Sequence, residues 1–291
     1  MPTFDTPTPI TVSLEFGIGD VRLTASERTD TTVDVRPTAS GKEADVAAAA
    51  QTRVEYGGGR LLVKGPSGWR RWRPTRGHES IDIEIALPAG SRVHVDAGVA
   101  SLLAVGALGE CNGKVGVGDV QLDETGALNL KTGVGDITVQ RVDGKVELVT
   151  GSGAVRIGTV GGSAWIKNSN GDTSVGAITG DVHVKSANGS IAIGRADGDV
   201  VAKTANGEVS IGEVARGTAV AQTAFGDLEV GIREGVPVWL DLSTKFGHVR
   251  NELDTSSEPG DRGDAVEVHA STSMGDIAIR RSFATSAGNA S

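Results

Sequence analysis

The chain has few of the residues on which many folds depend. Aromatic residues make up only 3% of its 291 positions, and Cys111 is its single cysteine. One thiol cannot form an internal disulfide, and no group of cysteines and histidines has the spacing of a zinc site. The scarcity of aromatic residues, together with 42 glycines, argues against a helical bundle and favours many short strands joined by tight turns.

Long apolar runs and an excess of positive charge are also missing. No stretch of about 18 apolar residues is present, so no membrane-spanning segment is expected. The opening residues, MPTFDTPTPI, lack the basic and apolar regions of a secretory signal. We therefore expect a cytoplasmic protein. Its formal net charge of -9 would repel nucleic-acid phosphates, so no nucleic-acid partner is predicted.

A close internal repeat is the main positive feature. The phrase KSANGSIAIG at 185–194 returns as KTANGEVSIG at 203–212. Alignment on the glycine of this phrase gives a column with steps of 17 to 19 residues, followed by steps of 21 and 28. This column contains Gly118, Gly135, Gly153, Gly171, Gly189, Gly207, Gly226, Gly247 and Gly275. A second column lies between its members and contains Gly109, Gly126, Gly144, Gly162, Gly180, Gly198, Gly217 and Gly235. Each unit of about 18 residues is therefore two short strands with two turns.

Apolar residues alternate within each half-unit, as in Ile191 and Ile193, which predicts strands with one buried face. Such strands could form stacked coils or a meander of hairpins. Matching residues at the repeat period favour stacked coils, because each side chain then contacts its copies. Small polar residues stand three positions before the glycine: Thr132, Thr150, Asn168, Ser186, Thr204, Thr223, Thr244 and Thr272. Just before it, Asn170, Asn188 and Asn206 suggest an amide ladder, and Phe225 and Phe246 suggest stacked rings. We predict an all-β fold, a single-stranded β-helix (β-solenoid) of roughly 18-residue coils.

The first hundred residues are less regular. Residues 40–52 predict one short capping helix, with Ser40 as its N-cap and Glu43 completing a capping box. The predicted organisation is an irregular β segment with this helix over 1–100, continuous with solenoid repeats over 101–282. Residues 283–291 are predicted to be a disordered tail.

Carboxylates follow the turn glycine at six places: Asp20, Asp119, Asp136, Asp172, Asp227 and Asp276. Calcium-binding repeats also place aspartates near glycines, but in a different register, and here the column is interrupted by other residues. We interpret these aspartates as polar turn residues. No metal and no cofactor is predicted.

No catalytic group is predicted. The carboxylates Asp123, Glu147, Glu229 and Asp241 are scattered, and no pair has the spacing of a glycosidase. The histidines are isolated, and none belongs to a triad with serine and aspartate. A strand follows each glycine turn, whereas a phosphate-binding loop requires a helix. The protein is therefore predicted not to be an enzyme, and a carbohydrate-binding or carbohydrate-active β-helix is left as an alternative.

Two groups of residues are candidates for binding. Within an acidic chain, Trp69, Arg70, Arg71, Trp72, Arg73 and Arg76 are concentrated in one loop. Tryptophan beside arginine suits a lipid-headgroup surface, a phosphate polymer or a protein interface. Lys167, Lys185 and Lys203 recur at the coil period and predict a basic strip on an outer face.

The phrases GVGDVQLDETGALNLKTGVGDITV, KNSNGDTSVGAITGDVHV, KTANGEVSIGEV and AQTAFGDLEVG resemble the DUF4097 family of β-strand-repeat proteins. The resemblance runs from Ile10 to about Arg281. It implies a β-solenoid, an adhesin or toastrack-type module, and an interaction role near the bacterial envelope, with no catalytic residue to transfer. We predict a non-enzymatic scaffold that binds another protein or the membrane surface, at a cytoplasmic or peripheral membrane location. Assembly into homo-oligomers or filaments is the alternative.

Overall fold

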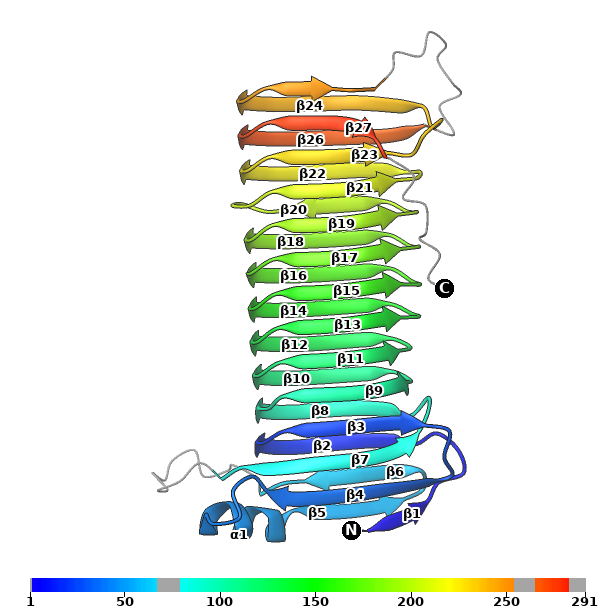
Figure 1. Ribbon diagram of the computed structural model, residues 1–291, viewed down its shortest axis with the longest axis vertical. Helices are drawn as coiled ribbons and strands as arrows, with labels where there is room; N and C mark the ends of the chain where they lie inside the picture. Colours follow the sequence, from blue (N-terminus) through cyan, green and yellow to red (C-terminus); the bar gives the residue numbers. More distant parts are fainter. Residues whose placement is uncertain (1, 67–78, 254–264, 283–291) are drawn as a thin grey trace, which may run out of the picture. The chain divides into compact units, whose positions relative to one another are not determined.

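The computed structural model describes residues 2–66, 79–253 and 265–282. The chain divides into two compact units, Met1–Ile157 and Gly158–Ser291, and each is described by itself. In both units the strands form two sheets, here called sheet A and sheet B. From β7 (Ile81–Pro88) onward, successive strands alternate between the sheets, so that a coil contributes one strand to each (Figure 1). The predicted β-solenoid is confirmed.

In the first unit, the strand order of sheet A is β1-β4-β7-β3-β9-β11-β13, and that of sheet B is β14-β12-β10-β8-β2-β6-β5. The strands of sheet A are β1 (Thr3–Asp5), β3 (Val21–Ser26), β4 (Asp30–Pro37), β7 (Ile81–Pro88), β9 (Leu102–Leu108), β11 (Val120–Thr125) and β13 (Ile137–Val142). Those of sheet B are β2 (Thr11–Ile18), β5 (Arg53–Gly57), β6 (Arg60–Lys64), β8 (Arg92–Val99), β10 (Cys111–Val117), β12 (Leu128–Val134) and β14 (Val146–Ser152). Strand β15 (Val155–Val160) crosses the boundary between the units.

The pairing distinguishes stacked coils from a meander. Strand β10 pairs in parallel with β8 and β12, which places Cys111 between Val93 and Leu128. A meander of hairpins would pair neighbouring strands antiparallel, so that alternative is wrong. Antiparallel pairs occur only near the N-terminal end of the described part of this unit, where β1 meets β4, β4 meets β7 and β5 meets β6.

Helix α1 (Glu43–Gln51) lies at the same end and contacts β4 and β7 (Figure 1). It starts later than Ser40, and Lys42 is its N-cap without a side-chain hydrogen bond, so the predicted Ser40 capping box is wrong. Asp45 holds this turn instead: its carboxylate lies 2.9 Å from Lys42 Nζ and accepts a hydrogen bond from Ser80 N at 3.0 Å. A contact with Ser80, far along the chain, replaces the local cap.

In the second unit, the strand order of sheet A is β17-β19-β21-β23-β27-β25, and that of sheet B is β24-β26-β22-β20-β18-β16. Sheet A contains β17 (Thr173–Ile178), β19 (Ile191–Ala196), β21 (Val209–Val214), β23 (Leu228–Ile232), β25 (Val249–Asn251) and β27 (Ile277–Arg281). Sheet B contains β16 (Ala164–Asn170), β18 (Val182–Asn188), β20 (Val200–Lys203), β22 (Thr218–Phe225), β24 (Val238–Phe246) and β26 (Val266–Met274). These strands pair with one another in parallel.

The last two coils of this unit are out of sequence order. Strand β26 pairs with both β22 and β24, so the final coil is inserted between the two coils that precede it in the chain. Met274 therefore lies between Phe225 and Phe246 in register, and the predicted stack of these two rings is wrong. Within the described residues, β24 and β25 each have one strand partner. Filament assembly from such edges stays a prediction.

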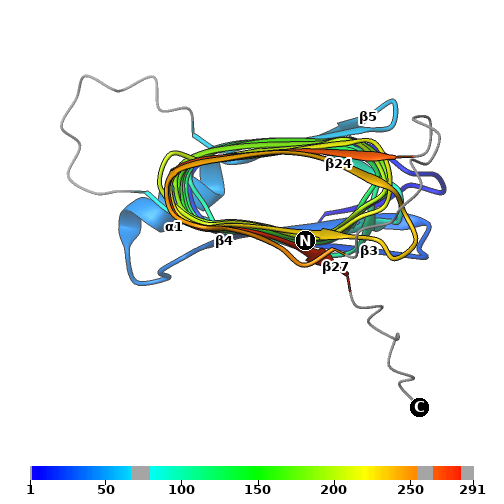
Figure 2. The ribbon, with the colours of Figure 1, turned by 90° about the horizontal axis from the view of Figure 1, so that it is seen from above.

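The core lies between sheets A and B, which face one another in the view along the stacking direction (Figure 2). Inward residues such as Ile191, Ile193 and Val209 are fully buried. At the corners, the amide group of Asn188 donates to Asn170 Oδ1 at 2.9 Å, and Asn206 donates to Asn188 Oδ1 at 2.9 Å. The predicted asparagine ladder is confirmed. It occupies exposed corners, whereas apolar packing fills the interior.

Candidate binding sites

The first predicted site lies outside the described residues. Trp69, Arg70, Arg71, Trp72, Arg73 and Arg76 all belong to the segment 67–78. The described strands and their corners carry three other candidate sites.

The turn aspartates have a structural role at all six predicted positions. Each carboxylate accepts a hydrogen bond, at 2.8 to 3.2 Å, from a backbone N–H in the adjacent coil. The acceptor and donor residues are Asp20 and Ser101, Asp119 and Asp136, Asp136 and Ala154, Asp172 and Ser190, Asp227 and Asp276, and Asp276 and His248. The hydrogen bond from His248 N–H, together with that from Arg250, lowers the pKa of Asp276. In the described segments, no group of three acidic, cysteine or histidine residues could hold a metal ion.

A basic strip runs across sheet B of the second unit. Lys167 lies beside Lys185, and Lys185 beside Lys203, on the adjacent parallel strands β16, β18 and β20. Adjacent strands are about 4.8 Å apart, so three like charges are held close together on the solvent-facing side. Like charges opposite one another destabilise a sheet. Among the described residues, none of these lysines forms an ion pair with a carboxylate. We call this group the lysine column, and its predicted alignment is confirmed.

An apolar column runs alongside it, two residues earlier in each strand. Trp165, His183, Val201 and Val220 are neighbours in register. The Nε2 atom of His183 is buried and has no hydrogen-bond partner in the described part of the chain. Burial, with help from Lys185 and Lys203, lowers the pKa of His183 and so favours the neutral form of its ring. The two columns run side by side on sheet B, one charged and one mainly apolar.

A second candidate site arises where one corner gains a residue. Ala196 is followed by Asp197 and Gly198, whereas Val214, its neighbour in register, is followed by Ala215, Arg216 and Gly217. Arg216 is therefore an extra corner residue, and it accounts for the 19-residue step between Gly198 and Gly217. The corners between sheets A and B form an open pocket of about 300 Å³ here, lined by Thr179, Arg195, Asp197, Ala215, Arg216 and Arg233. We call it the arginine pocket.

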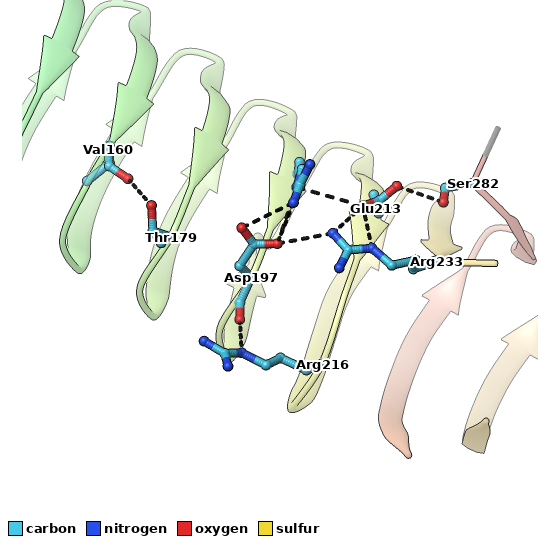
Figure 3. Close-up of polar contacts among 8 residues, drawn as sticks. Val160, Thr179, Asp197, Glu213, Arg216, Arg233 and Ser282 are labelled. Carbon is cyan, nitrogen blue, oxygen red and sulfur yellow. Dashed lines mark hydrogen bonds and ion pairs between the residues drawn. The ribbon is translucent and has the colours of Figure 1, made fainter. Parts of the chain in front are cut away.

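An ion network forms one side of the arginine pocket (Figure 3). Arg233 Nη2 lies 2.8 Å from Glu213 Oε1 and 3.2 Å from Asp197 Oδ1. Arg195 Nη2 also pairs with Asp197 Oδ1, at 3.1 Å. Arg216 is bound differently, because its Nε donates to the backbone carbonyl oxygen of Asp197 at 2.5 Å. Two guanidinium groups therefore pair with the two carboxylates, and the third contacts the backbone.

The pKa of Glu213 reflects this network. Burial favours the neutral acid, but hydrogen bonds from Arg233 and from Ser282 Oγ, together with the nearby positive charges, outweigh it and lower the pKa of Glu213. The hydrogen bond to Glu213 likewise raises the pKa of Arg233. At neutral pH, Glu213 is ionised and holds Arg233 in place.

This arrangement predicts a pH-dependent effect of Glu213→Gln. A carboxylate with a lowered pKa stabilises the fold above its unfolded pKa, about 4.3, and loses that contribution as pH falls through the folded value. We expect Glu213→Gln to lower the unfolding free energy by about 1 kcal/mol at pH 7. The difference should shrink as pH falls below about 4.3 and vanish only below the folded pKa of Glu213, which is lower. Urea unfolding of both proteins at several pH values measures this difference in unfolding free energy. Asp143→Asn, which removes the exposed Arg141–Asp143 pair, should have a smaller effect, and a pH-independent Glu213→Gln difference would contradict the assignment.

A third concavity, of about 320 Å³, is lined by Trp239, Leu240, Asp241, Glu267 and His269 on β24 and β26. His269 Nδ1 lies 3.2 Å from Asp241, and its Nε2 lies 4.0 Å from Glu267. The structure thus brings together acids that are scattered in sequence. A glycosidase general acid is held in an apolar pocket, whereas these carboxylates are 78% and 61% exposed. The geometry suits ligand contact better than glycoside hydrolysis.

Sequence reasoning found the lysine column but missed the arginine pocket and the Trp239 concavity. In the sequence, only the 19-residue step between Gly198 and Gly217 pointed to the arginine pocket, because it marks an inserted corner residue. The Trp239 concavity depends on the pairing of β24 with β26, which the regular period does not predict.

Parallel coils of two strands, closed by glycine corners, define the protein as a β-solenoid. The chain belongs to the Toastrack DUF4097 family, whose model matches residues 11–280, and the resemblance in the repeat phrases is thereby confirmed. No protein among the curated sequences matches it significantly. In the described segments, no helix is long and apolar enough to cross a membrane.

Several solved structures are similar to the chain over nearly its whole length. One, from Parabacteroides merdae, is described as a candidate adhesin; it is 12% identical, with a TM-score of 0.36 and coverage of 96% of this chain and 94% of that chain. Another candidate adhesin, from Bacteroides fragilis, is 13% identical, with a TM-score of 0.34 and coverage of 96% and 95%. A candidate lipid-binding protein from Parabacteroides distasonis is 14% identical, with a TM-score of 0.31 and coverage of 96% and 95%. The family membership and the fold fit a non-enzymatic scaffold.

Proposed function

We propose that this protein is a non-enzymatic scaffold that works at the periphery of a membrane, and that its lysine column docks on anionic lipid headgroups. The observation that carries this proposal is the alignment of Lys167, Lys185 and Lys203 on adjacent strands without a paired carboxylate among the described residues. A fold gains no stability from such an arrangement, since like charges repel. An anionic surface would remove the repulsion.

The neighbouring apolar column supports the choice of a lipid surface. Trp165 is 37% exposed and lies at one end of this column, and tryptophan with lysine is typical of surfaces that lie in the headgroup region. The sheet also presents both strips on one face, as a planar partner requires. The proposal includes a cytoplasmic location at the periphery of the membrane and a link to the bacterial cell envelope.

The expected energies suit reversible binding. A lysine close to an anionic membrane contributes about 1 kcal/mol, so three lysines give weak attachment that salt reduces. The chain's net charge of -9 opposes any broader attraction. Binding should therefore depend on this column rather than on the whole surface.

Replacing Lys167, Lys185 and Lys203 by glutamine should weaken binding to phosphatidylserine-containing vesicles by more than roughly tenfold. Cosedimentation at low salt measures it. The matched control replaces Arg22, Lys145 and Lys245 by glutamine, three exposed cationic residues that lie far apart in the strand order, on β3, before β14 and on β24, and changes the net charge equally. Equal binding by both triple variants, or no binding by the unmodified protein, would reject the proposal. Binding to polyglutamate but not to vesicles would indicate an acidic protein partner instead.

A further inference from the structure

We propose that the arginine pocket binds a phosphate group. The residues that line it carry an unequal charge, because three of them are arginines, Arg195, Arg216 and Arg233, and one is a carboxylate, Asp197. Glu213 pairs with Arg233 beside the pocket. The lysine column lies on the outer face of sheet B, whereas this pocket lies at the corners between the sheets, so the two sites are distinct.

Arg216 supplies the unpaired charge. Its Nε donates to a neutral carbonyl oxygen, and the side chain is exposed. No ion pair of Arg216 with a carboxylate is formed among the described residues. Its two terminal nitrogens therefore have no carboxylate partner among the described residues, and they keep the planar arrangement that binds phosphate oxygens in pairs.

The rest of the wall is already arranged for an anion. Arg195 and Arg233 are held by the carboxylates of Asp197 and Glu213, which fix the guanidinium groups before a ligand arrives. Arg281 braces the same corner by donating to the carbonyl oxygen of Arg233 at 3.1 Å. Preorganised donors lose less conformational freedom on binding.

The choice of phosphate follows from the number and placement of donors. The hydroxyl group of Thr179 also lines the pocket, and its hydrogen bond to Val160 O is long, at 3.4 Å. A phosphate offers three or four acceptor oxygens, which match donors on several sides better than the two oxygens of a carboxylate. A volume of about 300 Å³ leaves space for a substituent, so the phosphate can belong to a soluble compound or to a lipid headgroup.

Calorimetric titration of the full chain with inorganic pyrophosphate tests the proposal. We expect saturable binding that Arg216→Gln weakens about tenfold, since a charge-assisted hydrogen bond to an ion is lost. Arg216 is exposed and outside the ion network, so the variant should keep the melting temperature of the unmodified protein. Absence of saturable binding, or unchanged affinity in Arg216→Gln, would overturn the proposal.

The control is Arg141→Gln. Arg141 forms the same corner pair, with Asp143 two residues later, as Arg195 forms with Asp197, but it is not part of the arginine pocket. Its replacement should leave the pyrophosphate affinity unchanged, and an equal loss would show that the binding is unspecific.

Two further measurements identify the source of the phosphate and distinguish this proposal from lipid docking by the lysine column. Phosphatidic acid vesicles that displace pyrophosphate would assign a lipid headgroup, whereas retention of pyrophosphate in their presence would assign a soluble phosphate. The triple lysine variant should bind pyrophosphate normally. The failure of one site would then not be mistaken for the failure of the other.

Discussion

Gly135→Ala is expected to lower the free energy of unfolding of the first unit by about 3 kcal/mol. Gly135 has a φ of +140°, in a region where a side chain is strained. A Cβ atom there would lie 2.1 Å from the carbonyl oxygen of Gly118 in the adjacent coil. That oxygen belongs to the backbone, so no flexible side chain can move away.

Hydrogen bonds oppose any rearrangement of this corner. Gly135 N donates to Ser152 O at 2.8 Å, and Gly118 N donates to Val134 O at 2.8 Å. Moving the corner outward would stretch both hydrogen bonds. Because each corner of the stack touches the next, the cost cannot be absorbed by one coil alone.

Urea unfolding followed by circular dichroism measures this effect. Gly17→Ala is the matched control, because Gly17 lies in the phrase FGIGD of the same unit, has no positive φ, and a Cβ atom there would meet nothing within 4 Å. Its effect should stay within about 0.5 kcal/mol. Equal midpoints for the two variants would contradict the steric account of the corner.

Alkylation of Cys111 at pH 8 is expected to be about a thousandfold slower in the folded protein than in the unfolded chain. Cys111 is 1% exposed and has a core position on β10. Burial raises the pKa of its thiol to about 12, against about 8.5 for an exposed cysteine. The reactive thiolate is therefore scarce, and the reagent has no direct access to it.

Iodoacetamide labelling followed by mass spectrometry measures the rate, with the protein in urea as the reference. Cys111 is the only cysteine, so Cys111→Ala should incorporate no label. Gly135→Ala should increase the rate in native buffer, since Cys111 and Gly135 belong to the same unit. A folded-state rate within about tenfold of the unfolded rate would show that Cys111 is accessible.

The sequence predicted the features that depend on an equal repeat period. Asn170, Asn188 and Asn206 are 18 residues apart and form the predicted ladder. The lysine column was predicted for the same reason, since side chains one coil apart must be neighbours when coils stack in register. The glycine corners and the outward aspartates also follow from this period.

The order of the last coils could not be predicted. The steps of 21 and 28 residues revealed longer connections but not where they lead. Strand β22 can pair with either following strand, because Val268 on β26 and Leu240 on β24 both offer apolar residues to the core. The difference in free energy between placing β24 and placing β26 next to β22 depends on the packing of whole coils. No single column of the repeat predicts that difference.

The start of the helix was mispredicted for a related reason. Ser40 and Glu43 have the spacing of a capping box, but the contact of Asp45 with Ser80 competes with it. That contact joins residues 35 positions apart, so the local pattern carried no information about it.

By itself, the sequence determined the β-solenoid, its coil length, its corners and the lysine column, because all of these repeat along the chain at one period. Only the tertiary structure decided the coil order at the end of the second unit, the Trp239 concavity and the arginine pocket. These depend on contacts between residues far apart in sequence, as when Glu213 holds Arg233 and Ser282. Stacking in register makes repeated contacts predictable, whereas contacts formed where the repeat is interrupted require the folded chain.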